Sequence, residues 1–432
     1  MRKMHYLILG NCAAGLNGIE GIRSLDKKGE ITLISAESYP AYARCLITNF
    51  LIGTHSEEDL YLREKDFYQK NGVKVLPGKK AVRIFPKEKK VETEEGKKIP
   101  YDALLIATGA SPKALMVKGE EKKGVFGFRT LEDAKQILKR AEKAEKALVF
   151  GGGLIGLKAG YALKKKGLAV EVIVKSPRVL SRVVEENSSR LIAKWLQEKG
   201  IKIRTGLAAR EILGDKEMSG VLLDNGEEVK AQIAIVGKGV SPNLSFTEGS
   251  GINTHWGIVA DNYLRTNFQE IFVAGDVAET KDLVTGERTI NALWLAAQEQ
   301  GKTAGINMAG GEKAYPGSIG ANAAEFFGLP FISMGCLQAR NGEIIRERKE
   351  EKKFIYRRLV FKEGRLIGAV LVGKVEAAGI YMALIRKKER VENLMDELLE
   401  GWIDYGKFEK ILEGENGFRE TVTPDGRLIK LP

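Results

Sequence analysis

The chain repeats one pattern of apolar segments and glycine-rich turns, and this repeat constrains its fold more than any other feature. A short apolar strand, a glycine-rich turn, a helix-like stretch and a second strand occupy residues 6–34 and again residues 147–174. In both copies a charged, hairpin-like region follows, and then an apolar strand that begins a similar decapeptide, Ala103–Pro112 or Ile233–Pro242. The Gly, Ser and Pro shared by the decapeptides indicate an internal duplication. The sequence therefore predicts an α/β fold with two βαβ units.

The second glycine-rich turn has the spacing of a dinucleotide-binding site. Residues 151–156 follow the pattern Gly-x-Gly-x-x-Gly between a strand and a helix. Gly151 permits the tight turn, Gly153 lets a pyrophosphate approach the backbone, and Gly156 lets the helix pack closely on the sheet. The N-terminus of the helix faces the phosphate charge. We therefore expect a Rossmann-like domain here.

The end of the next strand bears on the choice between NADH and NADPH. An acid usually binds the adenosine ribose hydroxyls at this point, but Val174 is followed by Lys175, with Arg178 and Arg182 close behind. A cation there suits the 2′-phosphate of NADPH. The alternative is a solvated Lys175, with NADH bound by other contacts. Both alternatives remain open.

The first glycine-rich turn, residues 10–15, departs from the pattern because Cys12 replaces the second glycine. Its place after a strand and its repetition in the duplicate support the same role. Glu37, just past the strand that ends at Ser35, is the best-placed acid for an adenosine ribose. Asp276 ends another apolar strand ahead of a helix, where it could accept hydrogen bonds from a sugar-alcohol chain. A helix cap is the alternative for Asp276.

Six motifs occur in order: GNCAAG, YDALLIATGASP, VFGGGLIG, IVGKGVSPN, IFVAGDVAE and NALWLAAQEQGKTAGINMAG. In this order they closely resemble the FAD-dependent pyridine nucleotide-disulfide oxidoreductases, over essentially the whole chain. The resemblance implies two Rossmann-like domains, an FAD domain of residues 1–112 and 246–315 and an inserted NAD(P) domain of residues 113–245. It also implies a C-terminal α+β interface domain, residues 316–432, that forms a homodimer.

The resemblance and the two turns together give one set of cofactor-binding residues. The resemblance assigns the first turn and Glu37 to the adenylate half of FAD, Asp276 to its ribityl chain, and the second turn to NAD(P). The predicted cofactor-binding residues are Gly10, Cys12, Ala14, Gly15, Glu37, Arg44, Thr108, Gly109, Gly151, Gly153, Ile155, Gly156, Lys175, Gly239, Gly275 and Asp276.

The segment after Glu37 resembles two branches of the family. Coenzyme A-disulfide reductases, NADH oxidases and peroxidases place a redox cysteine eight residues before a closing glycine, as Cys45 precedes Gly53. Rubredoxin and ferredoxin reductases, and the flavin part of nitrite reductases, show instead the pattern formed by Pro40, Tyr42 and Arg44. Cys45 is the candidate catalytic residue in the first branch and only packs in the second.

Three further positions weigh on that choice. Oxygen- and peroxide-reducing members carry a His where this chain has Ala13, which cannot serve as an acid–base partner. Coenzyme A-disulfide reductases have an arginine that binds the nucleotide phosphates, and Arg23 matches it. They have Asn before the cysteine, where this chain has Arg44. A cation beside Cys45 is expected to lower the pKa of its thiol.

Composition excludes several classes of protein. Three cysteines in 432 residues form neither a disulfide framework nor a zinc site, and the three histidines show no ligand spacing, so no metal is predicted. No signal-peptide core or membrane-spanning stretch is evident, which predicts a cytoplasmic protein. The net charge of +12 comes from short lysine runs beside glutamates, without interleaved aromatics, so nucleic-acid binding is not expected.

These patterns support one main hypothesis and two alternatives. The main hypothesis is a homodimeric flavoenzyme that passes hydride from NADH or NADPH to FAD, and electrons on to an acidic ferredoxin or rubredoxin that complements the positive chain. The second is thiol-disulfide reduction through Cys45, with coenzyme A disulfide or a persulfide as substrate. The third is an FAD-bearing electron-transfer subunit of a larger complex.

Overall fold

The contacts of the chain divide it into two compact units. The computed structural model describes residues 3–338, 342–401, 406, 419–422 and 428–431. The first unit contains the chain up to Leu180 together with Gln197–Ser318, and the second contains Ser181–Leu196 together with the chain from Ile319 onward. Both glycine-rich turns therefore belong to the first unit.

A five-stranded parallel sheet forms one half of the first unit, in the order β19-β7-β1-β2-β3. Leu7 in β1 and Leu104 in β7 are fully buried, as the central strands of a sheet covered on both faces must be. Because β19 comes from far along the chain, two separate segments build this sheet. That arrangement confirms the predicted discontinuous domain. The strands are β1 (His5–Leu9), β2 (Glu30–Ser35), β3 (Val73–Pro77), β7 (Ala103–Ile106) and β19 (Ile271–Val273).

A second five-stranded parallel sheet has the order β12-β11-β10-β16-β9. Its central strand β10 lies between β11 and β16, as β1 lies between β2 and β7 in the first sheet. The matching order confirms the internal duplication and the two Rossmann-like folds. The strands are β9 (Val125–Phe126), β10 (Lys146–Phe150), β11 (Ala169–Val174), β12 (Ile201–Thr205) and β16 (Ile233–Val236).

The charged, hairpin-like region of each copy is a three-stranded antiparallel sheet. A further small sheet pairs β18 with β20 and β20 with β21. The strands of the three sheets are β4 (Ala81–Phe85), β5 (Lys90–Thr93) and β6 (Lys98–Pro100); β13 (Ala209–Leu213), β14 (Gly220–Leu223) and β15 (Glu228–Lys230); and β18 (Ile258–Val259), β20 (Ala278–Lys281) and β21 (Arg288–Thr289).

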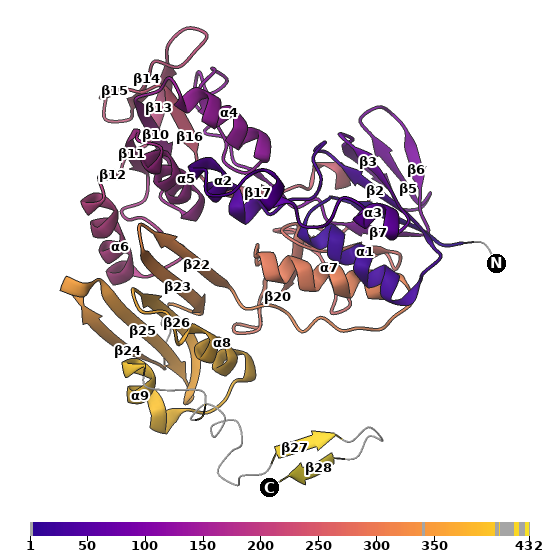
Figure 1. Ribbon diagram of the computed structural model, residues 1–432. Helices are drawn as coiled ribbons and strands as arrows, with labels where there is room; N and C mark the ends of the chain where they lie inside the picture. Colours follow the sequence, from indigo (N-terminus) through magenta and orange to yellow (C-terminus); the bar gives the residue numbers. More distant parts are fainter. Residues whose placement is uncertain (1–2, 339–341, 402–405, 407–418, 423–427, 432) are drawn as a thin grey trace. The chain divides into compact units, whose positions relative to one another are not determined.

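Helices α1 (Ala13–Leu25) and α7 (Trp294–Met308) lie side by side next to the first sheet (Figure 1). Their backbones approach so closely that a Cβ on Gly301 would lie 2.1 Å from the carbonyl oxygen of Ala14. Only glycine fits such a contact. The other helices of this unit are α2 (Ile47–Ile52), α3 (Phe67–Lys70), α4 (Leu131–Ala141) and α5 (Leu154–Lys165).

The ends of the two duplicated decapeptides pair with each other. β8 (Ala110–Pro112) and β17 (Val240–Pro242) form a two-stranded antiparallel sheet in which Ser111 lies opposite Ser241. Asn243 follows β17, donates its side-chain amide to the carbonyl of Thr108 at 2.8 Å and accepts a hydrogen bond from the hydroxyl of Ser111 at 2.7 Å. The two decapeptides therefore contact each other directly, at the point where the chain passes between the two parallel sheets.

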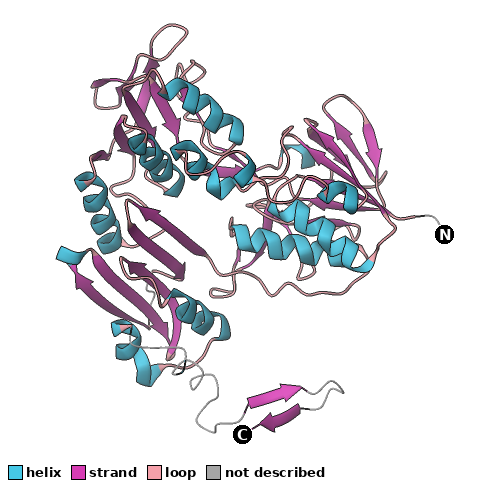
Figure 2. Ribbon diagram, in the orientation of Figure 1, coloured by secondary structure: helices cyan, strands magenta, loops and turns pink. Residues whose placement is uncertain are grey.

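The second unit is built on a five-stranded antiparallel sheet in the order β22-β23-β26-β25-β24 (Figure 2). Helix α8 (Ala378–Lys387) packs on β23 and β26, and α9 (Met395–Glu400) on β24 and β25. This sheet domain confirms the predicted C-terminal α+β fold. The strands are β22 (Ala321–Phe326), β23 (Leu329–Gly335), β24 (Glu343–Glu350), β25 (Ile355–Lys362) and β26 (Arg365–Val372), followed by the paired strands β27 (Arg419–Val422) and β28 (Leu428–Leu431).

Most of helix α6 (Glu186–Glu198) belongs to the second unit. The indole N–H of Trp195 donates to the carbonyl of Phe326 at 2.7 Å, and its ring packs edge-on against Phe354. Across the described ranges, no helix is both long and apolar enough to span a bilayer.

Candidate functional site

A pocket of about 560 Å³ lies at the carboxyl ends of the strands of the first sheet. Its walls come from the residues that follow β1, β2, β7 and β19 and from the start of α7. Ligands of open α/β sheets bind at this edge, and pockets of about 300–1,000 Å³ suit small molecules. The predicted residues that line the pocket are Gly10, Cys12, Ala14, Glu37, Arg44, Cys45, Thr108, Gly109, Gly275 and Asp276.

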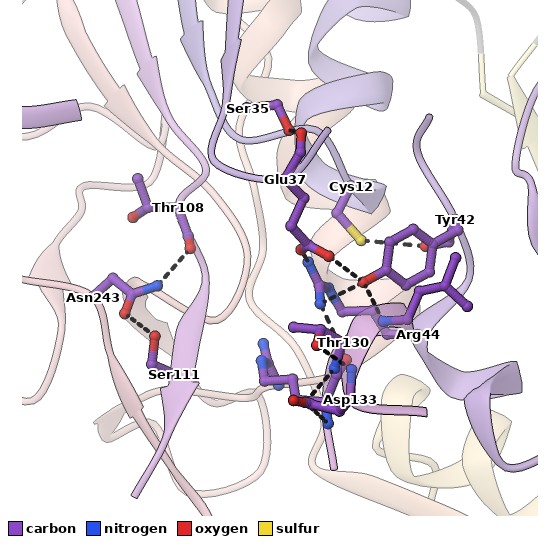
Figure 3. Close-up of polar contacts among 12 residues, drawn as sticks. Cys12, Ser35, Glu37, Tyr42, Arg44, Thr108, Ser111, Thr130, Asp133 and Asn243 are labelled. Atoms are coloured by element: carbon purple, nitrogen blue, oxygen red, sulfur yellow. Dashed lines mark hydrogen bonds and ion pairs between the residues drawn. The ribbon is translucent and has the colours of Figure 1, made fainter. Parts of the chain in front are cut away.

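The first glycine-rich turn forms the base of this pocket. Gly10 has a φ of +117°, and a Cβ on Gly15 would lie 2.0 Å from the carbonyl oxygen of Gly10. Gly15 therefore permits the turn to close without itself lining the pocket. The thiol of Cys12 faces the carbonyl of Tyr42 at 3.7 Å (Figure 3), and no side chain caps the N-terminus of α1. The uncapped backbone N–H groups can receive an anion despite the missing second glycine.

Glu37 is held by two neighbouring side chains rather than facing the pocket alone (Figure 3). One carboxylate oxygen forms an ion pair with Arg44, and the other accepts from the hydroxyl of Tyr42 at 2.5 Å. The Tyr42 oxygen also accepts from the backbone N–H of Leu131, the first residue of α4, at 3.0 Å. Burial raises the pKa of Tyr42 well above its usual value, so the hydroxyl keeps the proton that it donates to Glu37. This network joins the pocket to the neighbouring helix.

Asp276 is paired with Arg129, a residue that the sequence analysis missed. Their side chains form an ion pair at 3.0 Å, and the carbonyl of Arg129 accepts from Arg44 at 3.1 Å. The backbone N–H of Gly275 donates to the buried side chain of Gln300 at 2.8 Å. Arg129 stands just before Thr130, whose side chain forms a capping box at the start of α4. That capping signal is readable in the sequence and marks Arg129 as the residue that leads into a helix, but it does not relate Arg129 to Asp276.

Thr108 supplies a polar atom without a partner. Its hydroxyl is buried and forms no hydrogen bond within the described part of the chain, and the residue is among those that line the pocket. Unpaired buried polar atoms are costly, so a polar ligand atom would stabilise this position. The unpaired hydroxyl, the uncapped helix and the volume of the pocket fit a bound dinucleotide.

Cys45 lies exposed on the pocket wall, one residue beyond Arg44. The expectation that Arg44 lowers the pKa of its thiol is wrong, because the guanidinium turns toward Glu37 and Tyr42 instead. The residues around the sulfur exclude enough water to raise the thiol pKa, although the amine of Lys158 on α5 opposes this shift. Cys45 is therefore less ionised at neutral pH than an ordinary cysteine.

Arg23, the predicted contact for coenzyme A, does not line this pocket. Its guanidinium donates to three backbone carbonyls, those of Asn71, Asp26 and Gly29, at 2.8–2.9 Å. These bonds fasten the end of α1 to two loops. They lend no support to a phosphate-binding role, which stays a prediction.

The second glycine-rich turn lies apart from the pocket, after β10, with the same geometry as the first. Gly151 has a φ of +127°, and a Cβ on Gly156 would lie 2.0 Å from the carbonyl oxygen of Gly151. Gly153 precedes α5, and a Cβ there would meet open space, so a ligand can approach its backbone. Ile155, on the first turn of α5, is 40% exposed, and Gly239 is exposed after the matching strand β16.

Comparison with known proteins identifies the family. Residues 4–301 match the family described as pyridine nucleotide-disulphide oxidoreductase. The chain belongs to this family. Residues 321–389 match the C-terminal domain of rubredoxin NAD⁺ reductase. Membership confirms the sequence-based expectations of an oxidoreductase fold, of FAD and of a pyridine nucleotide as cofactors.

Three similar proteins illustrate the range of the family. The assimilatory nitrate reductase electron transfer subunit of Bacillus subtilis is 30% identical over 86% of this chain and 48% of its own length. The NADH-rubredoxin oxidoreductase of Clostridium acetobutylicum is 26% identical over 91% of this chain and 97% of its own. The structure of an NAD-dependent persulfide reductase from A. fulgidus is 28% identical, with a TM-score of 0.83 over 91% of this chain and 79% of its own. This chain thus spans about half the length of the Bacillus relative.

Proposed function

We propose that the chain is an FAD-dependent NAD(P)H oxidoreductase that passes electrons to a small iron–sulfur protein of the rubredoxin or ferredoxin kind. The match of residues 321–389 to a rubredoxin reductase domain supports this acceptor. So does the likeness to an NADH-rubredoxin oxidoreductase over nearly all of that protein's length. The net charge of +12 favours association with an acidic partner.

The choice between a protein acceptor and a disulfide acceptor rests on the reactivity of the Cys45 thiol. Its thiol pKa is raised, and Arg44 is committed to Glu37 and Tyr42. The first glycine-rich turn has Ala13 where a thiol-based peroxidase would need an acid–base partner. A thiol in these surroundings is a poor nucleophile. Electron transfer from the flavin to a protein acceptor therefore agrees best with the site.

The first pocket would hold FAD, whose bound flavin links a two-electron hydride donor to a one-electron acceptor. The uncapped start of α1 would bind the pyrophosphate. Arg44 and Tyr42 would orient Glu37, whose oxygens each keep a lone pair for a ribose hydroxyl. Arg129 would orient Asp276 toward the ribityl chain. The residues proposed for FAD are Gly10, Cys12, Ala14, Gly15, Glu37, Arg44, Thr108, Gly109, Gly275 and Asp276.

The turn after β10 would hold the pyridine nucleotide. Its glycine backbone and the N-terminus of α5 suit a pyrophosphate, and Gly153 leaves the room that the ligand needs. The residues proposed for NAD(P) are Gly151, Gly153, Ile155, Gly156, Lys175 and Gly239.

The test is NAD(P)H-dependent reduction of a purified rubredoxin and of a [2Fe–2S] ferredoxin, measured from low to high salt. We expect turnover with at least one of them, at a rate that falls as ionic strength rises. The Cys45→Ser variant should retain this turnover. Failure to reduce either protein, or rates independent of salt, would contradict the proposal.

Thiol reduction through Cys45 is the second candidate, and three observations favour it. Cys45 is an exposed residue on the pocket wall, and the amine of Lys158 opposes the rise of the thiol pKa. The persulfide reductase of A. fulgidus shares the fold at 28% identity. Here coenzyme A disulfide and coenzyme A persulfide are the substrates to assay. Full activity of Cys45→Ser on them would end this candidate.

The finer assignments belong to the same proposal. The FAD domain would comprise residues 1–112 and 246–315, the NAD(P) domain residues 113–245, and the interface domain residues 316–432. The chain would act as a cytoplasmic homodimer, which sedimentation of the purified protein tests. An electron-transfer subunit of a larger complex is the remaining alternative, given the name of the Bacillus relative. Slow dye reduction by the isolated chain, accelerated by partner proteins, would favour that alternative.

A further inference from the structure

Helix α5, which begins within the second glycine-rich turn, lies against the segment that lines the first pocket. It packs along α2 (Figure 1). At the far end of the two helices, a Cβ on Gly53 would lie 3.6 Å from the amine of Lys166. Eight residues earlier on each segment, the amine of Lys158 interacts electrostatically with the thiol of Cys45. Lys158 therefore extends from the helix of the nucleotide turn to the pocket wall at Cys45.

The amine of Lys158 has no acid beside it. The residue is half-buried, and within the described ranges no hydrogen bond or ion pair engages its amine. Cys45 is the titratable group that acts on it, and the thiol pKa of Cys45 is itself raised, so the thiol supplies little negative charge. Lysines are seldom buried without a paired acid. An unpaired amine beside a ligand pocket suggests a negative charge that a ligand supplies.

Reduced FAD carries such a charge. The isoalloxazine ring is neutral when oxidised and bears one negative charge after a hydride, two electrons with one proton, has passed to it from NAD(P)H. In the proposed function, Glu37 binds the adenosine ribose and Asp276 the ribityl chain, which leaves the pocket wall at Cys45 for the ring. Because few water molecules screen a half-buried amine, its charge acts strongly on a group at that wall.

We propose that Lys158 raises the midpoint potential of the bound FAD by stabilising its negatively charged reduced form. The inference rests on the proposed function in one respect, namely that the first pocket holds FAD. Arg44 and Arg129, the two arginines among the described residues that line this pocket, are each paired with an acid. The charge of Lys158 is not compensated in this way. Lys158 acts through its charge alone and forms or breaks no bond.

The test is the midpoint potential of the FAD holoenzyme, measured without oxygen against a reference dye of known potential. Dithionite reduces the flavin and the dye together, and neither pyridine nucleotide nor electron acceptor is present. Lys158→Met keeps a side chain of similar length and removes its charge. We expect the equilibrium constant for reduction of the flavin to fall about tenfold in this variant, which lowers the potential of a two-electron couple by about 30 mV.

Further variants make the test specific to the charge of Lys158. Lys158→Gln should give the same fall, and Lys158→Arg should keep the wild-type potential. Lys164→Met removes a lysine from the same helix and should leave the potential unchanged. Lys158→Met in a Cys45→Ser background should show the full fall, because the charge acts on the flavin and not through the thiol. The FAD content and the oxidised flavin spectrum of each variant show whether its site is intact.

An unchanged potential in Lys158→Met and Lys158→Gln would overturn the inference. So would an equal fall in Lys164→Met, or a fall that disappears in the Cys45→Ser background. These measurements involve no electron acceptor, so a failed assay with rubredoxin and ferredoxin would reject the proposed acceptor and leave the effect of Lys158 as measured. Conversely, a potential that Lys158 does not influence would reject only this inference.

Discussion

The pKa of the Cys45 thiol depends on which charged side chains lie close to its sulfur. The adjacent Arg44 forms an ion pair with Glu37 and a hydrogen bond with Tyr42. Lys158, from a different helix, is the cation that lowers the thiol pKa. Burial in turn lowers the pKa of Lys158, and Cys45 opposes that shift. The residue next to Cys45 in the sequence is therefore not the one that influences its thiol pKa.

Removal of the Lys158 charge should make Cys45 less reactive. In Lys158→Met the thiol pKa rises further, so the rate of alkylation by iodoacetamide at pH 8 should fall about threefold or more. Mass spectrometry of the peptide that contains Cys45 separates this reaction from those of the other cysteines. Lys164→Met, on the same helix, is the control. An unchanged rate in Lys158→Met would show that the amine does not act on the sulfur.

Loss of the Tyr42 hydroxyl should destabilise the first unit. Tyr42→Phe leaves the N–H of Leu131 and one oxygen of Glu37 without their partner, which costs about 1–3 kcal/mol for buried groups. Tyr39→Phe removes a bond to Glu132 on the exposed surface and should cost less than about 0.5 kcal/mol. Urea unfolding measures both. Equal effects of the two substitutions would contradict a structural role for the Tyr42 network.

The sequence patterns predicted most helices and strands correctly, and where a boundary differs, the structure shows the physical cause. The predicted strand Ala169–Val174 matches β11, because every residue from Val170 to Val174 is buried. The glycine pattern of residues 151–156 was expected to precede a helix, but that helix already begins at Leu154, within the pattern. Gly153 is the extended residue before the helix, whereas Gly156 is already helical and serves to bring it close to Gly151. The glycine pattern spans the turn and the first helical residues together.

Strand β11 has a buried acid whose charge the fold depends on. Glu171 is 2% exposed and lies 2.9 Å from Lys146, 3.3 Å from Lys202 and 3.2 Å from Arg204. Burial raises the pKa of this carboxyl, but the three cations outweigh it and hold the pKa below its usual value. The folded state therefore binds a proton less readily than the unfolded state. This stabilisation is present above about pH 4.3, the usual pKa of glutamate, and is lost as the pH falls through the folded-state pKa.

Glu171→Gln should accordingly cost stability at pH 7 and progressively less in acid. We expect a loss of about 1–3 kcal/mol at pH 7, because three cations lose their shared counter-charge. The difference from wild type should shrink as the pH falls below about 4. Glu186→Gln, which breaks an exposed pair with Arg190, is the control and should have little effect. A gap between Glu171→Gln and wild type that stays constant with pH would contradict the assignment.

At the scale of the molecule, the local motifs could be predicted and the contacts between them could not. The two glycine-rich turns and the duplicated decapeptides are contiguous stretches, so their patterns identified them. The ion pair of Arg129 with Asp276 joins residues 147 positions apart, and only the folded chain brings them together. The pairing of Ser111 with Ser241 likewise depends on the arrangement of the two copies. Sequence repetition showed that these segments are equivalent, but not that they are partners.

We expect the flavin to be the only redox group that NAD(P)H reduces, and an anaerobic titration measures how many such groups there are. The purified yellow protein is titrated with NADPH, and in a parallel sample with NADH, while the flavin spectrum is followed and reducing equivalents are counted. We expect one equivalent of nucleotide to bleach the flavin completely. Two equivalents, with a long-wavelength thiolate-to-flavin band after the first, would contradict it and make Cys45 a working redox residue.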